Sequence, residues 1–254
     1  MSVKAIIGAA LAVIAVCLAA GGVYAVHVLK HEKVDAETLC PSEGSNTVTL
    51  VIIDKTDPLT AAEQGQIRNV VEKARDNISR GDRLTVKVIR PGESANETVL
   101  DTVADLCNPG AEANPLFENP KRVAARYQAA FIEPVKEALA SLNTAGEALQ
   151  SPIARAITSA IDATPANSGQ QIRLILISDL MEHTEDASAY AGTLKEASLR
   201  KLMTKTAQAR LKDASIQVLL LHRSKYAVKQ EAAAGVWRRF LQEVTGREPE
   251  FLGL

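Results

Sequence analysis

Two aspartates in this sequence stand where they could do chemistry. Asp54 ends the apolar stretch VIID at residues 51–54, and the hydroxyl of Thr56 follows two residues later. Asp179 ends a second apolar stretch, IRLILIS, in the same manner. An aspartate so placed can act as a nucleophile that takes up a phosphoryl group, or it can join a neighbouring hydroxyl in holding a divalent metal ion. The elements that carry the two aspartates decide whether they share a site.

Three near-continuous apolar segments predict strands that are buried on both faces of a parallel sheet, because no polar face alternates along them. These segments are residues 47–53, 172–178 and 215–222. Residues 83–90 alternate as a further strand, with residues 97–106 as its antiparallel neighbour. Helical patterns separate the strands, so the sequence predicts an α/β fold with a mostly parallel central sheet and helices on both faces.

The expected helices have recognisable starts and interruptions. Thr60 and Glu63 have the spacing of a capping box that opens the first helix. Pro134 interrupts a long apolar stripe and predicts a kink or division there. Ser151 and Pro152 predict the start of another helix, with the serine at the N-cap. The last two helices are expected over residues 194–213 and 228–244.

Ligand sites of such sheets lie at the carboxyl ends of the strands. Asp54 and Asp179 both occupy that end, so we expect them to share a site. The loop that follows, with Glu182 and Asp186, is acidic and expected to be solvated. Over roughly residues 47–245 the chain resembles the von Willebrand factor A-like (vWA) domain. The metal-ion-dependent adhesion site of that family combines a DxSxS loop, a threonine at a helix start and an aspartate after the fourth strand.

The resemblance implies a divalent cation at this edge, Mg²⁺ or else Mn²⁺ or Ca²⁺, bound by hydroxyls and, directly or through water, by carboxylates. Its expected ligands are Asp54, Thr56, Ser151 and Asp179. Pro58 replaces the last serine of the family's loop and supplies no side-chain ligand, so the affinity for metal should fall. Without metal the hydroxyls have structural roles, Thr56 in a turn and Ser151 as a helix cap.

The phosphoryl-transfer alternative rests on DKTDPLT at residues 54–60, which resembles the DKTGT motif of P-type ion pumps. A haloacid-dehalogenase-like phosphotransferase needs a flap after the first strand, and a helix that begins near Thr60 leaves little room for one. Asp57 and Pro58 also replace the glycine and threonine that the turn requires. We therefore favour metal binding over a nucleophilic Asp54, and expect no enzyme activity.

Residues 5–29 form an uncharged run long enough to cross a bilayer with a hydrocarbon core of about 30 Å. We favour a retained, bacterial-type single transmembrane helix. The alternative is a cleaved signal peptide, since Val23–Ala25 loosely resembles a cleavage site. Cys40 and Cys107 are either a disulfide of an oxidising compartment or two buried thiols. With the short tail before the run, they favour a periplasmic or otherwise extracytoplasmic domain.

The sequence thus divides into an anchor (1–29), a polar linker (30–46) and a vWA-like domain (47–254) with a helical insertion at about residues 108–150. The formal net charge is -1 and no basic block occurs, which excludes an evident nucleic-acid surface. The resemblance implies a membrane-anchored protein-interaction module that binds a protein partner at its metal site. A metal-free structural scaffold of a membrane complex is the alternative.

Overall fold

The computed structural model of the chain comprises two compact units, Met1–Val34 and Asp35–Leu254. It describes residues 12–22, 34–92, 97–115, 118–140, 142, 147–167 and 169–253. In the first unit, residues 12–22 are helical and exposed, and the rest of the predicted span 5–29 lies outside the described residues. Among the helices that the structure describes, none is both long and apolar enough to cross a membrane. The transmembrane helix stays a prediction.

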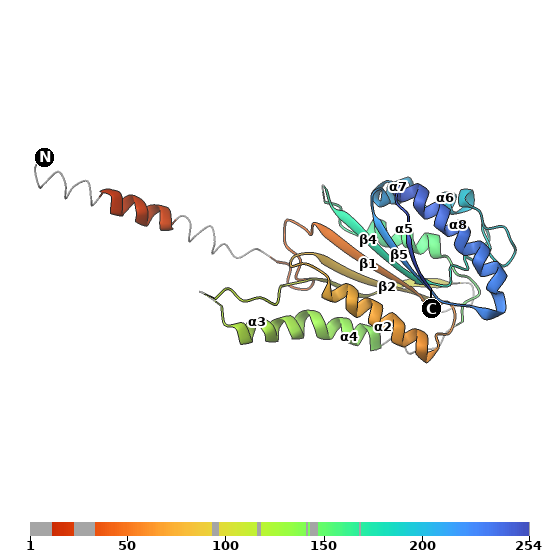
Figure 1. Cartoon of the computed structure of the whole chain (residues 1–254), viewed down its shortest axis with the longest axis horizontal. Helices are drawn as coiled ribbons and strands as arrows, with labels where there is room; N and C mark the ends of the chain where they lie inside the picture. Colours follow the sequence, from red (N-terminus) through yellow and green to blue (C-terminus); the bar gives the residue numbers. More distant parts are fainter. Residues whose placement is uncertain are drawn as a thin grey trace, which may run out of the picture. The chain divides into compact units, whose positions relative to one another are not determined.

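The second unit is built on a six-stranded sheet with the order β3-β2-β1-β4-β5-β6 (Figure 1). β3 runs antiparallel to β2, and the other neighbouring pairs are parallel. The strands are β1 (Thr47–Asp54), β2 (Arg83–Pro91), β3 (Thr98–Cys107), β4 (Gln171–Ser178), β5 (Ser215–Leu220) and β6 (Glu250–Gly253). The expected, mostly parallel α/β sheet is confirmed. The sixth strand was not predicted, because four residues are too few to show a strand pattern.

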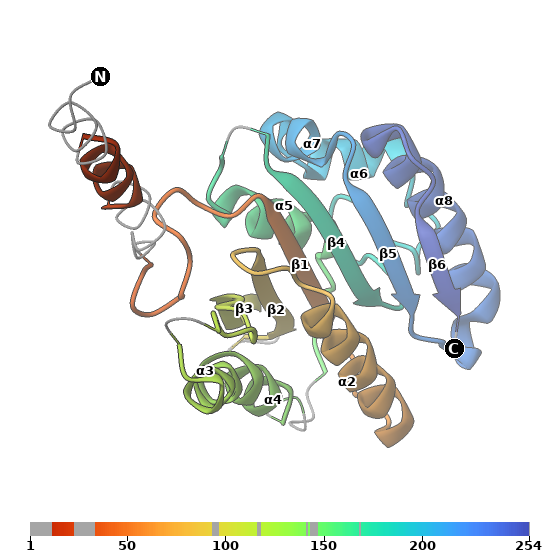
Figure 2. The same ribbon diagram turned by 60° about the vertical axis from the view of Figure 1, so that its left-hand side comes forward.

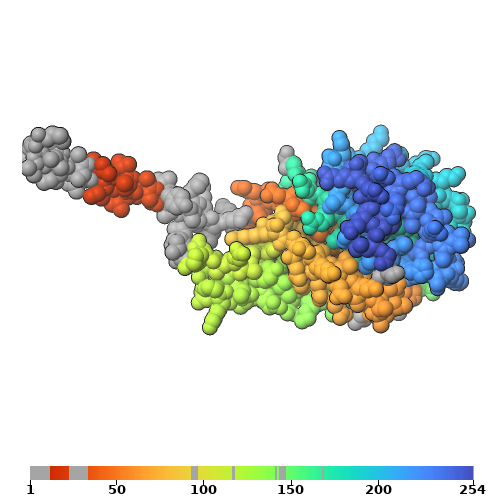
Figure 3. Space-filling model, viewed as in Figure 1, coloured from red at the N-terminus to blue at the C-terminus, as the bar shows by residue number. Residues whose placement is uncertain are grey.

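Helices cover both faces of this sheet, as the sequence predicts (Figure 2). One face carries α2 (Ala61–Asp76) and the succession of α3 (Pro120–Tyr127), the π-helix η1 (Gln128–Ile132) and α4 (Glu133–Ala140). The other face carries α5 (Ile153–Ala163), α6 (Glu196–Leu202), α7 (Lys205–Leu211) and α8 (Ala227–Thr245). Figure 3 shows the first group in orange and green, and the C-terminal helices in blue.

The central strand β1 sends alternate side chains into the two helical layers, which explains its unbroken apolar sequence. Leu50 and Ile52 pack in the cluster that includes α5 and α8, whereas Val51 and Ile53 pack in the cluster that includes α2 and α4. None of the four is more than 1% exposed. Successive residues of a strand face opposite sides, so a strand covered on both sides needs apolar residues throughout. Its last residue, Asp54, reaches the carboxyl edge of the sheet.

Two of the predicted helices are interrupted. Pro134 divides the helical insertion as expected, because the chain passes through η1 and α4 begins one residue before this proline. The single helix expected over residues 194–213 is wrong, since the structure contains α6 and α7 instead. Thr204 starts α7, and its hydroxyl oxygen accepts the N–H of Ala207 at 3.1 Å. Such a cap satisfies an otherwise unpaired N–H group at a helix start. A second helix can therefore begin in the middle of the span that was predicted as one helix.

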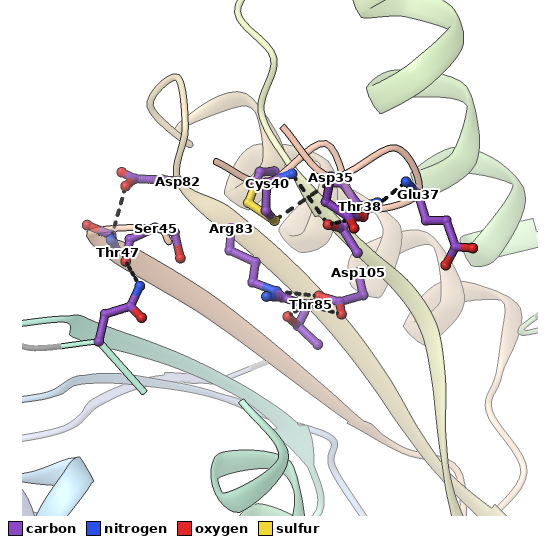
Figure 4. Close-up of a disulfide and its surroundings, with 12 residues drawn as sticks. Asp35, Glu37, Thr38, Cys40, Ser45, Thr47, Asp82, Arg83, Thr85 and Asp105 are labelled. Atoms are coloured by element: carbon purple, nitrogen blue, oxygen red, sulfur yellow. Dashed lines mark hydrogen bonds and ion pairs between the residues drawn. A yellow bond between two sulfur atoms is a disulfide. The ribbon is translucent and has the colours of Figure 1, made fainter. Parts of the chain in front are cut away.

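Residues 35–46 pack against the sheet before β1 begins. A disulfide joins Cys40 to Cys107 at the end of β3 (Figure 4), and this decides between the two alternatives for these cysteines. Beside it the N–H of Cys107 donates to the carbonyl of Thr38 at 2.7 Å. The carboxylate of Asp35 accepts the N–H and the hydroxyl of Thr38. The compact unit accordingly begins at Asp35.

Candidate functional site at the carboxyl edge of the sheet

Asp54 is the centre of a hydrogen-bonded cluster at the carboxyl end of β1, and it is 5% exposed. Its Oδ1 accepts the N–H of Thr56 at 3.0 Å and the hydroxyl of the same residue at 2.7 Å. Its Oδ2 accepts the hydroxyls of Ser178 at 2.8 Å and of Ser151 at 3.2 Å. These four hydrogen bonds offset the cost of burying the carboxylate. Ser178 was not predicted as a site residue, although its position directly before Asp179 places it at the same edge of the sheet.

Ser151 reaches this cluster because it does not cap the following helix. Pro152 holds the N-cap position of α5, so the predicted serine cap is wrong by one residue. The main chain of Ser151 instead pairs with that of His183 through two N–H···O=C bonds of 2.9 Å. The side chain is thereby directed to Asp54, and its oxygen also lies 3.1 Å from the hydroxyl oxygen of Thr56. The structure thus brings three of the four predicted ligands into contact.

Asp179, the fourth predicted ligand, follows the end of β4 and is 4% exposed. Its Oδ1 accepts the N–H of Met181 at 2.9 Å, and its Oδ2 accepts Nε–H of Arg223 at 3.1 Å. Burial and then the charge of Asp54 raise the pKa of Asp179 to about 7, against the opposing effects of these two donors. The two aspartates therefore interact through their charges at one edge of the sheet.

Arg223 is a cation at this edge, and it was not predicted as a site residue. It lies in the loop after β5 and forms ion pairs with Glu63 at 2.6 Å and with Asp179 at 3.1 Å. Asp57 is the third carboxylate, 3.8 Å from Nε of the same guanidinium. A signal for Arg223 was present in the sequence, because it follows the third apolar strand at the same edge as the two aspartates.

Glu182 was expected in a solvated loop, but the structure shows it fully buried. Its Oε2 accepts the N–H of Ala154 in the first turn of α5 at 2.9 Å, and its Oε1 has no hydrogen-bond partner among the described residues. Burial, with a contribution from the charge of Asp54, raises the pKa of Glu182 to about 8. Asp186 of the same loop is exposed, as expected, and pairs with Arg155.

The cluster around Asp54 has the donor chemistry of a divalent-cation site. Mg²⁺ binds oxygen ligands in an octahedron whose neighbouring oxygens lie about 2.9 Å apart. The hydroxyl oxygens of Thr56 and Ser151 lie 3.1 Å from each other, and they lie 2.7 Å from Oδ1 and 3.2 Å from Oδ2 of Asp54, respectively. These are hydrogen-bond distances, and they are also compatible with the spacing of neighbouring ligands. Pro58 adds no ligand. Within the described part of the chain, no three His, Cys, Asp or Glu side chains gather to hold a metal ion, so the hydroxyls are essential to such a site.

Comparison with known proteins finds likenesses of fold at low sequence identity. No protein-family model and no curated protein matches this chain. A solved structure described as von Willebrand factor type A from Catenulispora acidiphila is 17% identical, with a TM-score of 0.38. The match covers 76% of this chain and 43% of that one.

Two solved structures from Bacteroides are also similar. An aerotolerance-related membrane protein from Bacteroides fragilis NCTC 9343, with multiple mutations to serines, is 15% identical over 68% of this chain and 66% of that chain, with a TM-score of 0.33. The conserved hypothetical protein BatB from Bacteroides thetaiotaomicron is 13% identical over 69% of this chain and 67% of that chain, with a TM-score of 0.33.

Proposed function

We propose that this chain is a vWA-like protein-interaction module that binds a protein partner at the carboxyl edge of its sheet through a divalent cation. The observation that carries the proposal is the contact between Asp54 and Ser151, which brings a carboxylate and a hydroxyl together from positions 97 residues apart. When bound, the cation offers a coordination position that an acidic side chain of the partner can complete. Thr56 supplies a second hydroxyl and Asp179 a second carboxylate at the same edge.

The proposed location is a membrane, with the domain outside the cytoplasm. The disulfide between Cys40 and Cys107 supports this, because disulfides persist in oxidising compartments. The apolar run of residues 5–29 supports a single-span tether. Together these features favour a partner that is also exposed to the extracytoplasmic space.

A nucleophilic Asp54 receives less support from the same geometry. Both oxygens of its carboxylate accept hydrogen bonds, two on each oxygen, and the side chain is nearly buried. An attacking oxygen needs an unobstructed line to phosphorus, and these donors crowd that approach. A cation is less affected, because the hydroxyls of Thr56 and Ser151 would bind it while Asp54 could bind through water. Helix α2 also begins at Ala61, which leaves a short segment where a flap is required. We therefore propose binding and no phosphoryl transfer.

A metal-free scaffold is the second candidate, and Arg223 is the observation that favours it. The guanidinium already supplies a positive charge to Asp179 and Glu63, so the edge can be assembled without a metal ion. In that case the face would keep its shape and bind its partner without a bridging cation. The two candidates differ in one measurable property, namely whether divalent cations stabilise the fold.

A metal titration of the full chain in detergent tests the proposal. A ligand that binds only the folded state at one hundred times its Kd stabilises it by about 2.7 kcal/mol. We expect Mn²⁺ and Mg²⁺ to raise the melting temperature of the wild type, and to have no effect on Asp54→Asn. The matched control is Asp186→Asn, an exposed carboxylate in the neighbouring loop, which should respond like the wild type.

If metal still stabilises Asp54→Asn, Asp54 is not a ligand of the metal. Absence of stabilisation in the wild type and in both variants would favour the scaffold. The partner is then sought by affinity capture from detergent-solubilised membranes with Mg²⁺ or with a chelator. A partner retained by Mg²⁺ and lost with the chelator supports the proposal, whereas capture that is insensitive to the chelator supports the scaffold.

A further inference from the structure

Arg223 connects three carboxylates that come from three parts of the chain. Glu63 lies in the first turn of α2, Asp57 in the loop after β1, and Asp179 directly after β4. Nη1 of the arginine lies 2.6 Å from Glu63, and Nε lies 3.1 Å from Asp179 and 3.8 Å from Asp57. The arginine side chain is 18% exposed, so water and salt screen these ion pairs only in part.

The main chain of Arg223 is held independently of these ion pairs. Gln230 of α8 is 2% exposed, and its Oε1 accepts the N–H of Arg223 at 2.8 Å. The amide nitrogen of the same side chain donates to the carbonyl of Asp179 at 3.0 Å and to that of Leu221 at 2.6 Å. One buried amide therefore ties the loop of the arginine to the loop of the aspartate, and the guanidinium is kept facing the carboxylate.

Both oxygens of the Asp179 carboxylate accept a hydrogen bond, one from the N–H of Met181 and the other from the guanidinium of Arg223. A divalent cation beside Asp54 that also used Asp179 would need the same carboxylate and would meet the positive charge of Arg223. A neighbouring opposite charge changes the proton affinity of a carboxylate by roughly 10- to 1,000-fold. The same electrostatic term acts on its affinity for a metal ion.

We propose that Arg223 is a built-in counter-ion of Asp179 that competes with the divalent cation and so sets the metal affinity of this face. The inference rests on the proposed function, because it concerns the same cation. Without metal, the arginine neutralises Asp179 and holds the edge together. If a metal were bound, Asp179 would be its ligand, and the ion pairs with Glu63 and Asp57 would be left to hold the guanidinium at the edge.

Calorimetric titration of Mn²⁺ into the full chain tests the competition. Removing the charge in Arg223→Gln should tighten Mn²⁺ binding by about tenfold, the lower end of the effect of a neighbouring charge on a carboxylate. Arg155→Gln is the matched control, because Arg155 is an exposed arginine of the same region that pairs with Asp186 and contacts no predicted ligand. Its Mn²⁺ affinity should equal that of the wild type. Equal or weaker binding by Arg223→Gln overturns the inference.

A second measurement needs no variant. Arg223 donates its Nε–H to Asp179, so the nitrogen-15 signal of this group should shift as Mg²⁺ is added, with the same midpoint as a calorimetric titration of Mg²⁺. A signal that does not move while Mg²⁺ binds overturns the inference and leaves the metal site in place. Metal binding by Arg223→Gln but not by the wild type would support the competition and would overturn the proposed function, because Arg223 would then occupy the place of the metal in the natural chain. Binding by neither chain overturns both the inference and the proposed metal site.

Discussion

The hydroxyl of Ser151 donates to Asp54 Oδ2 at 3.2 Å, although 97 residues separate the two in the chain. The contact depends on two independent placements. Strand β1 carries Asp54 to the carboxyl edge, and the pairing of Ser151 with His183 holds the serine opposite it. A metal ligand has to present a lone pair to the cation, and a hydroxyl can do so while it still donates its proton to the carboxylate. The Ser151 hydroxyl is therefore the most direct probe of the site.

We expect Ser151→Ala to weaken Mn²⁺ binding by about tenfold, the factor that corresponds to the loss of one hydrogen-bond-sized interaction to a charged group. Without metal, the same change should lower the free energy of unfolding by about 1.5 kcal/mol, because the Asp54 carboxylate loses one of its four donors. Calorimetry and thermal melts measure the two effects. Ser151→Thr keeps the hydroxyl and serves as the control. An unchanged affinity in Ser151→Ala would show that the serine is not a ligand.

Asp54→Asn should leave the metal-free domain folded and equally or slightly more stable. Its Oδ1 can still accept both bonds from Thr56, and the serine hydroxyls can rotate to accept from the new amide. The change also removes a charge that raises the pKa of Asp179. The measurement is the melting temperature in the presence of a chelator, with Asp54→Ala as the reference that loses every acceptor. A loss in Asp54→Asn as large as that in Asp54→Ala would contradict the expectation.

Glu182 predicts a pH dependence with a definite sign. Its pKa is about 8 in the fold, against 4.5 for an exposed carboxyl, so the folded state holds its proton more tightly than the unfolded chain does. The resulting stabilisation is complete below pH 4.5 and is lost as the pH rises through 8. It amounts to at most about 5 kcal/mol. Glu182→Gln keeps a polar group of similar shape and should lose this dependence.

Urea unfolding of Glu182→Gln and of the wild type at pH 5, 7 and 9 provides the measurement. The wild type should lose stability relative to the variant at each step towards higher pH. The difference between the two chains isolates this residue, because Asp179 titrates in both. Stability curves that run parallel over this range would mean that Glu182 does not hold its proton in the fold.

Reducing the disulfide should destabilise the domain. The bridge closes a segment with a sequence separation of 67, which corresponds to about 4 kcal/mol in the chain-entropy model. Denaturant titrations with and without reductant measure the difference, and Cys40→Ser with Cys107→Ser should reproduce the reduced value. Thiol counting on denatured, unreduced protein should detect Cys17 alone. Three reactive thiols would exclude the bridge.

The membrane prediction is tested by fractionation. If residues 5–29 span the bilayer, a reporter fused after Leu254 should sediment with membranes and resist carbonate extraction. The control is the same fusion without residues 1–29, which should be released. N-terminal sequencing decides the alternative, because a mature chain that begins near Val26 would identify a cleaved signal peptide.

The parts of the fold that follow from local pattern were predictable. The capping box of Thr60 and Glu63 is present in both directions, with bonds of 2.7 and 3.2 Å, because its two partners are only three residues apart. The apolar strands were predictable because burial on both faces removes polar residues from them. The division at Thr204 was not, since one cap residue inside a helical pattern leaves the periodicity intact.

Fewer features of the site than of the fold could be predicted from local sequence patterns. Asp54 and Asp179 were predictable, because the carboxyl ends of neighbouring parallel strands meet at one edge. The burial of Glu182 was not, since it depends on the pairing of Ser151 with His183, a contact that no local pattern encodes. The role of Arg223 could be predicted only if the carboxylates around it were known, and these carboxylates come from separate elements. The position of Arg223 after an apolar strand could have placed it at this edge, but its ion-pair partners could not be read from a single sequence.

The Cys40–Cys107 bond also has a mechanical consequence. The bond connects the chain before β1 covalently to the end of β3. Tension on the segment before Cys40 can therefore pass directly to β3 without first passing through β1. Residues 41–46 then lie off the shortest covalent path, although this segment stays packed, because Ser45 is buried and its carbonyl accepts an N–H of the Gln170 side chain. β3, an outer strand of the sheet, is then the first strand to receive the load, and β2 separates it from β1, which ends at Asp54. If the N-terminus is tethered, the load would therefore enter the sheet at β3 and not at the strand that carries Asp54.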